Sequence, residues 1–217
     1  MSYQMIHMEV AYRLLDKFCW IKNRGDYMLG SVAPDSVHFY PEYNLYLKEN
    51  SHLWNYGPRW GMTVESDKWR DNILEFWEEH KNCENRDFIA GFCVHILTDW
   101  INDRTVFAPF RERIQSVDEY DNVYAIYAHE AYGSDQWLYQ QSEHTSDIMK
   151  LIAQGQSCSI SGCVVDEDIE CQKKHLLTKQ YAGKEPFNIC DYQYCTEEVT
   201  WNFINECVDV IGELLAE

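Results

Sequence analysis

Residues 88–100, Phe-Ile-Ala-Gly-Phe-Cys-Val-His-Ile-Leu-Thr-Asp-Trp, carry the strongest structural signal in the chain. The stretch is apolar nearly throughout, which predicts a buried helix. His95 and Asp99 are four residues apart, so on a helix they lie on one face. A buried carboxylate is costly unless it is paired or binds a metal ion. This helix alone leaves two readings open: a divalent-metal site, or a core histidine hydrogen-bonded to an aspartate.

Helical periodicity runs through most of the rest of the chain. Residues 4–20 place apolar side chains at near-helical spacing, and a charged segment with a glycine, residues 22–25, follows them. No strand-like alternation of any length and no internal repeat is present. We therefore predict one all-α domain over residues 1–217, a helical bundle. Its further predicted helices span residues 66–82, 85–103, 118–153 with a break at Gly133-Ser134, 166–181 and 196–216.

Residues 25–62 interrupt the helical pattern. They are rich in Gly, Pro, Asn, Tyr and His, which predicts a long ordered loop with a short helix after Pro41. Loops of this length in compact domains are usually functional or disordered, and the many aromatic residues here argue against disorder. We therefore expect this loop to contribute metal ligands.

The chain is strongly acidic. Its 18 Lys and Arg residues against 36 Asp and Glu residues give a net charge of −18, which disfavours nucleic-acid binding and adsorption to anionic membranes. Hydrophobic residues make up 46% and aromatic residues 15%, which indicates a globular chain rather than a disordered one. No apolar stretch is long enough to span a bilayer, and the first residues lack a signal-peptide pattern. The expected location is the cytoplasm, without stable membrane insertion.

Cysteine is abundant, with nine residues in the chain. Cys19, Cys83, Cys93 and Cys207 fall in apolar helical patterns, so we expect them to be buried thiols. The other five, in the segment 158–195, show no pair with the two-residue gap of a zinc knuckle. Reduced structural thiols are therefore favoured over a second metal site or a disulfide framework.

Several potential metal ligands fall outside the central stretch. His7 lies in the first predicted helix, Asp35 ends a turn-forming segment with His38 shortly after it, and His52 follows Ser51. Zinc binds imidazole nitrogen and carboxylate oxygen, and catalytic sites leave a position open for water. Each residue alone also has a purely structural interpretation; Asp35, for example, could simply form a turn after the proline.

Four segments occur in an order typical of a known family. They are Ile6-His7, the Gly-Ser-x-Ala-Pro-Asp turn over residues 30–35, Ser51-His52, and Gly91-Phe92-x-x-His95-x-x-x-Asp99. In these segments the chain resembles the zinc-dependent phospholipase C family of bacteria, a domain type also found at the N-terminal end of glycosylphosphatidylinositol-specific phospholipase D. The resemblance covers about residues 1–150, and residues 151–217 are expected to add further helices.

The resemblance implies a role for each of the matching residues. It implies that one zinc ion is bound by Asp35, His52, His95 and Asp99. It also implies that His7 binds a neighbouring metal ion, with Asp99 as a shared bridge, and that Asp35 serves as general base. Paired metals polarise a phosphoryl oxygen and acidify bound water, as phosphodiester hydrolysis requires. Iron, manganese or cobalt would suit the same nitrogen and oxygen ligands.

The chain also departs from the family pattern. The family follows its His-x-x-x-Asp motif with two more His and a Glu for another zinc, whereas Asp99 is followed here by Trp-Ile-Asn-Asp-Arg-Thr. Glu130 and Asp135 fall in a pattern similar to cytosolic members, which makes them candidate additional ligands; the alternative is a surface acid. Arg104 is a candidate phosphate clamp, or a surface residue that pairs with Asp103 or the helix end. One or two metal ions are expected.

Three functions remain in competition. The first is a metal-dependent phosphoester hydrolase acting on a small or lipid-derived phosphodiester. The second is a non-catalytic metal-binding module, favoured by the missing histidines. The third, a nuclease for single strands, is disfavoured by the net charge of −18 and the lack of an evident basic track.

Overall fold

The computed structural model describes residues 3–58, 61–114 and 120–216, and in these residues it forms ten α-helices and no strand. The all-α prediction is confirmed. The helices are α1 (Gln4–Leu14), α2 (Arg24–Gly30), α3 (Leu45–Ser51), α4 (Ser66–His80), α5 (Arg86–Asn102), α6 (Ala108–Ile114), α7 (Tyr120–Gln141), α8 (Thr145–Gln154), α9 (Asp166–His175) and α10 (Glu197–Leu214). Tighter or wider turns add a 3₁₀ helix (Ala33–Phe39) and two π-helical turns (Asp103–Phe107 and Leu176–Gln180).

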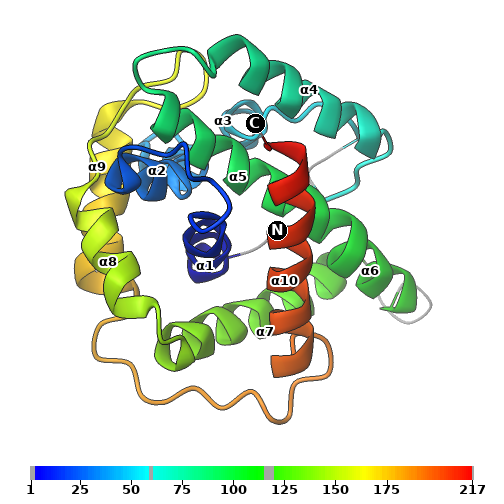
Figure 1. The fold of residues 1–217 in the computed structure, drawn as a ribbon. Coiled ribbons are helices and arrows are strands. Elements are labelled where there is room, and N and C mark those ends of the chain that lie inside the picture. The colour runs from blue at the N-terminus through cyan, green and yellow to red at the C-terminus, as the bar shows by residue number, and fades with distance from the viewer. Residues whose placement is uncertain (1–2, 59–60, 115–119, 217) are drawn as a thin grey trace.

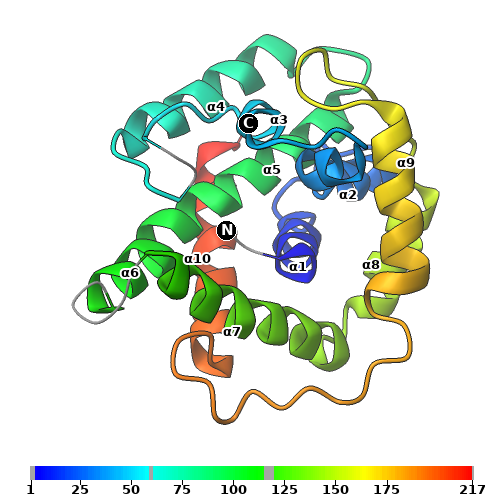
Figure 2. The ribbon, with the colours of Figure 1, turned by 180° about the vertical axis from the view of Figure 1, so that it is seen from behind.

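Helix α1 occupies the centre of the molecule. Figures 1 and 2 show it nearly end-on, surrounded by the other helices, and it packs against α2, α5, α7, α8 and α10. Its residues from Met5 to Ala11 are all buried, including the polar His7 and Glu9. A helix covered on every side places its polar side chains inside the protein, where each needs a partner.

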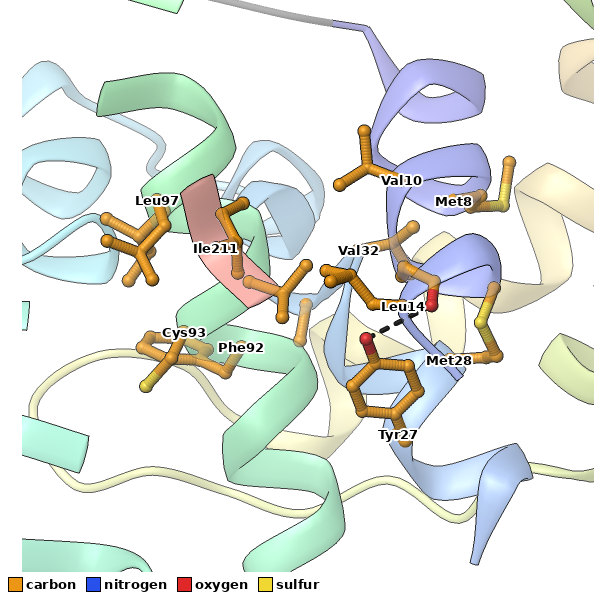
Figure 3. Packing of buried hydrophobic residues seen from close by; sticks show 14 of the residues in the cluster. Met8, Val10, Leu14, Tyr27, Met28, Val32, Phe92, Cys93, Leu97 and Ile211 are labelled. Carbon is orange, nitrogen blue, oxygen red and sulfur yellow. Dashed lines mark hydrogen bonds between the residues drawn. The ribbon is translucent and has the colours of Figure 1, made fainter. Parts of the chain in front are cut away.

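Helix α5 is the second buried helix, and it confirms the prediction for residues 85–103. Every residue from Phe88 to Asn102 is buried. Figure 3 shows its apolar side chains packed with those of neighbouring helices, and the Tyr27 hydroxyl donates to the Ala11 carbonyl at 3.1 Å. The labelled side chains are Met8, Val10, Leu14, Tyr27, Met28, Val32, Phe92, Cys93, Leu97 and Ile211.

The segment predicted as a long loop is ordered but largely helical. The short helix predicted after Pro41 is confirmed as α3, and the segment also contains α2 and the 3₁₀ helix where a loop was predicted. Side chains of Asn23 and Asn44 accept hydrogen bonds from Asp26 N and Leu47 N and so cap α2 and α3. These caps are local signals for short helices that the abundance of glycine and proline obscured.

Two predicted helices end elsewhere. Helix α1 ends at Leu14 rather than near residue 20. The predicted helix 118–153 is broken between α7 and α8, at residues 142–144, whereas Gly133 lies inside α7. The predicted start of this helix, residue 118, lies outside the described residues. The Tyr192 hydroxyl occupies the place where a Cβ of Gly133 would stand, so this glycine serves close packing rather than a break.

The cysteine predictions are confirmed in part. All nine cysteines are free, and Cys93 and Cys207 are buried as predicted. Cys19 and Cys83 are exposed instead, and both lie beyond the ends of their helices, since α1 ends at Leu14 and α4 at His80. Among the described residues, no helix combines the length and apolar character needed to cross a bilayer.

Candidate metal centre

His95 is oriented by the close approach of α2 to α5. Gly91 permits this approach, since a Cβ there would overlap the Tyr27 carbonyl oxygen. As a result, Nδ1 of His95 lies 2.9 Å from the Ser31 carbonyl oxygen. A carbonyl oxygen only accepts, so Nδ1 carries a proton, and Nε2 is the ring nitrogen that could bind a metal ion.

His52, at the end of α3, is oriented in the same way. Its Nδ1 lies 2.9 Å from the Lys48 carbonyl oxygen and 2.9 Å from the Ser51 hydroxyl, whose own proton goes to that carbonyl. Nδ1 of His52 is therefore also the protonated nitrogen. The Nε2 atoms of His52 and His95 are 3.3 Å apart, so two lone pairs face each other. A cation between them removes this repulsion, and backbone carbonyls commonly orient metal-binding histidines.

Two carboxylates complete the cluster. Asp99 directs Oδ1 towards His7 Nε2 and Oδ2 towards His52 Nε2, both at 3.5 Å. Asp35 directs Oδ1 towards His52 Nε2 at 3.5 Å and Oδ2 towards His95 Nε2 at 3.9 Å. Two triads have ligand atoms within 4.8 Å of one another and could each hold a metal ion: His7, Asp35 and His95, and His52, His95 and Asp99.

His7 is the least satisfied member of this cluster. Its ring is fully buried and stacks on that of His95, with the centroids 3.6 Å apart and the planes at 11°. Within the described part of the chain, neither ring nitrogen of His7 has a hydrogen-bond partner. Buried polar groups are nearly always satisfied, so an orphaned imidazole in contact with a carboxylate fits a metal ligand.

The electrostatics set the protonation states that a metal requires. Burial lowers the pKa of His7 well below its usual range and that of His52 to about 4, so both rings are neutral at pH 7. Burial opposes ionisation of Asp35, but its neighbours, the Lys48 ammonium foremost, outweigh this effect and hold its pKa well below the usual range. The pKa of Asp99 is likewise lowered, against the effect of burial. Neutral imidazoles and ionised carboxylates are the forms that bind metal ions.

The cluster meets a cleft of about 330 Å³ through Asp35. Gln4 and Lys48 line the cleft on either side of this carboxylate: Gln4 Nε2 donates to Oδ2 at 2.7 Å, and Lys48 Nζ donates to Oδ1 at 3.1 Å. Much of the remaining wall is aromatic and includes Tyr3, Phe39, Tyr43 and Tyr127. The volume is in the range of small-molecule sites.

The structure brings together all five residues predicted as ligands, which are His7, Asp35, His52, His95 and Asp99. The three further candidates engage other groups. Glu130 accepts from the backbone amides of residues 193–195, and Asp135 accepts from the amides of Met5 and Ile6 and the Tyr181 hydroxyl. The Arg104 guanidinium lies 4.7 Å from the centre of the Trp100 ring. Neither carboxylate belongs to the two triads.

Sequence reasoning missed Gln4 and Lys48, which hold the Asp35 carboxylate. Their only sequence signal is spacing: Gln4 is three residues before His7 and Lys48 is four before His52, so each shares a helix face with a ligand. Comparisons of the chain with protein-family models, curated proteins and solved structures found no match. The chemistry of the cluster therefore rests on its own residues.

Proposed function

We propose that this protein is a metal-dependent phosphoester hydrolase of phospholipase C type, with zinc as the metal. One observation carries the proposal: a buried cluster of imidazole lone pairs and carboxylates meets a small-molecule cleft through Asp35. The resemblance of the four sequence segments to the zinc-dependent phospholipase C family points to the same activity.

The donor set favours zinc and allows one or two ions. Imidazole nitrogen and carboxylate oxygen are zinc ligands, and the buried, preoriented rings suit a small ion with short bonds. The two oxygens of Asp99 face different histidines, His7 and His52, so this carboxylate could help to hold more than one ion. When bound, such ions supply Lewis acidity and acidify a water molecule.

Asp35 is the residue of the cluster that reaches the substrate. It is 8% exposed and lines the cleft, whereas His7, His52 and His95 are fully buried behind it. Its lowered pKa keeps the carboxylate ionised, so one of its oxygens can accept the proton of the attacking water. Gln4 and Lys48 fix its orientation.

The test is hydrolysis of bis(p-nitrophenyl) phosphate and p-nitrophenyl phosphorylcholine by zinc-loaded protein. We expect turnover by the wild type and none by His95→Gln, which loses the central ligand. His80→Gln is the matched control, because His80 lies on α4 outside the triads, with Nδ1 bonded to the Phe76 carbonyl. Stoichiometric zinc without any turnover would contradict the hydrolase and support a non-catalytic metal-binding module.

A further inference from the structure

Lys48 is a cation placed at the boundary between the cluster and the cleft. It lies on α3 with its side chain 13% exposed, and it is the only Lys or Arg among the described residues that line the cleft. Its Nζ is 3.1 Å from Asp35 Oδ1 and 3.5 Å from His38 Nε2. The ammonium is therefore one hydrogen bond away from the carboxylate that faces the reacting water in the proposed function.

The charge of the site depends on Lys48. The site holds two carboxylates, Asp35 and Asp99, and one ammonium, Lys48, and the formal charges of these three groups sum to a net negative charge. One divalent ion turns the resulting net negative charge into a net positive charge. Without Lys48, the same loaded site would be neutral, and the net charge of −18 on the chain would oppose the approach of an anion.

We infer that Lys48 binds a non-bridging oxygen of the phosphoryl group that enters this cleft. This role rests on the proposed function: Lys48 would position the substrate by binding its negatively charged phosphoryl group. A single ammonium suits the single negative charge of a phosphodiester, and the aromatic walls suit its alcohol parts. The rival role for Lys48 is that of a counter-ion needed only to keep Asp35 ionised in a buried place.

Phosphate binding separates the two roles. The probe is inorganic phosphate, titrated by calorimetry into zinc-loaded wild type, Lys48→Met and Lys48→Arg, with zinc content measured in each sample. We expect Lys48→Met to keep its zinc and to bind phosphate about tenfold to a hundredfold more weakly, the effect of losing one charge-assisted hydrogen bond. Lys48→Arg should keep most of the affinity. Lys150→Met is the control, because Lys150 is an exposed lysine that pairs with Asp147 on α8.

Three outcomes would overturn the inference: no phosphate binding by the wild type, wild-type affinity in Lys48→Met, or loss of zinc together with phosphate in that variant. The last would assign Lys48 to the stability of the metal centre. Failure of the proposed function looks different. A protein that binds phosphate through Lys48 but cleaves no ester keeps this inference and removes the hydrolase.

Discussion

Two buried polar residues of α1, His7 and Glu9, each belong to a cluster of polar side chains. His7 and Glu9 are both fully buried, yet they meet different surroundings. Glu9 accepts from Arg13 Nε at 2.8 Å, from the Ser142 hydroxyl at 2.7 Å and from His144 Nδ1 at 2.8 Å. Around His7, by contrast, the nearest polar groups are carboxylates and the lone pairs of other imidazoles.

The difference shows which buried charges point to function. Glu9 is satisfied by donors from its own helix and from the turn between α7 and α8, so it joins elements of the fold. In the cluster of His7, Asp35, His52, His95 and Asp99, imidazole nitrogens and carboxylate oxygens lie within 4.8 Å of one another in two triads, each of which could hold a metal ion. Both clusters bury polar groups, and the one around His7 has the composition of a metal site.

The largest expected effect follows from removing the charge of Asp35, the member of the His7 cluster that lines the cleft. Asp35→Asn keeps the shape of the side chain and removes the carboxylate that accepts the proton of water. We expect kcat/KM for bis(p-nitrophenyl) phosphate to fall about 10²- to 10⁴-fold, the range for loss of a general base. Asp71→Asn, at an exposed site on α4, is the matched control. Wild-type kcat/KM in Asp35→Asn would remove Asp35 from the reaction.

Metal removal should destabilise the protein through the His7 cluster alone. Free zinc at a thousand times its Kd adds about 4 kcal/mol to the free energy of unfolding. For a chain of this size, that corresponds to a change in Tm of about 8–16 °C. Calorimetric scans with and without a chelator should show this change in the wild type and in Glu9→Gln, and no change in His95→Gln. An equal response in all three proteins would place the metal elsewhere.

Removing the charge of Glu9 should lower the free energy of unfolding and leave the metal bound. In Glu9→Gln, the Arg13 guanidinium loses its carboxylate partner, which is fully buried, and Ser142 and His144 lose the charge of their shared acceptor. We expect the free energy of unfolding in urea to fall by about 3 kcal/mol, as for a broken buried ion pair. Glu78→Gln, which removes the partner of Lys81 at an exposed position, controls for the loss of surface charge. Loss of zinc from Glu9→Gln would show that metal binding at the His7 cluster depends on Glu9.

The smallest expected effect, counted per pH unit, concerns Asp135, a third buried carboxylate near α1. Burial outweighs its three hydrogen-bond donors and raises its pKa to about 7, above that of the unfolded chain. The folded state therefore binds more protons between about pH 4 and 7, and stability falls as the pH rises through this window, by up to about 1.4 kcal/mol per pH unit. Unfolding in urea at pH 5, 6 and 7 should show this slope in the wild type and a weaker one in Asp135→Asn. Identical slopes would mean that Asp135 does not titrate there.

Local periodicity predicted the central helix and the relation of its ligands. The prediction of residues 85–103 differs from Arg86–Asn102 by one residue at each end, and His95 and Asp99 both face the cluster. The prediction of a helix break at Gly133 was wrong, because the reason for a glycine at this position lies outside the helix. Tyr192, 59 residues further along the chain, fills the space beside this glycine, and no local pattern shows such a contact.

The candidate ligands could be named from the sequence, but their surroundings could not. The proton positions on His52 and His95 follow from the carbonyl groups of Lys48 and Ser31, which depend on the fold of α3 and on the approach of α2 to α5. The link from Gln4 to Asp35 likewise joins two elements, α1 and the 3₁₀ helix. Spacing placed Gln4 and Lys48 beside ligands, but nothing local marked them as partners of Asp35.

Metal content tests the central claim most directly. Wild type, Glu9→Gln and His95→Gln would be incubated with zinc, dialysed and measured by plasma mass spectrometry. We predict at least one zinc ion per chain in the wild type and in Glu9→Gln, and none in His95→Gln, because only the last change removes a ligand shared by both triads. A wild type without bound metal, or a His95→Gln variant that retains it, would contradict the account and leave the His7 cluster as a buried structural network.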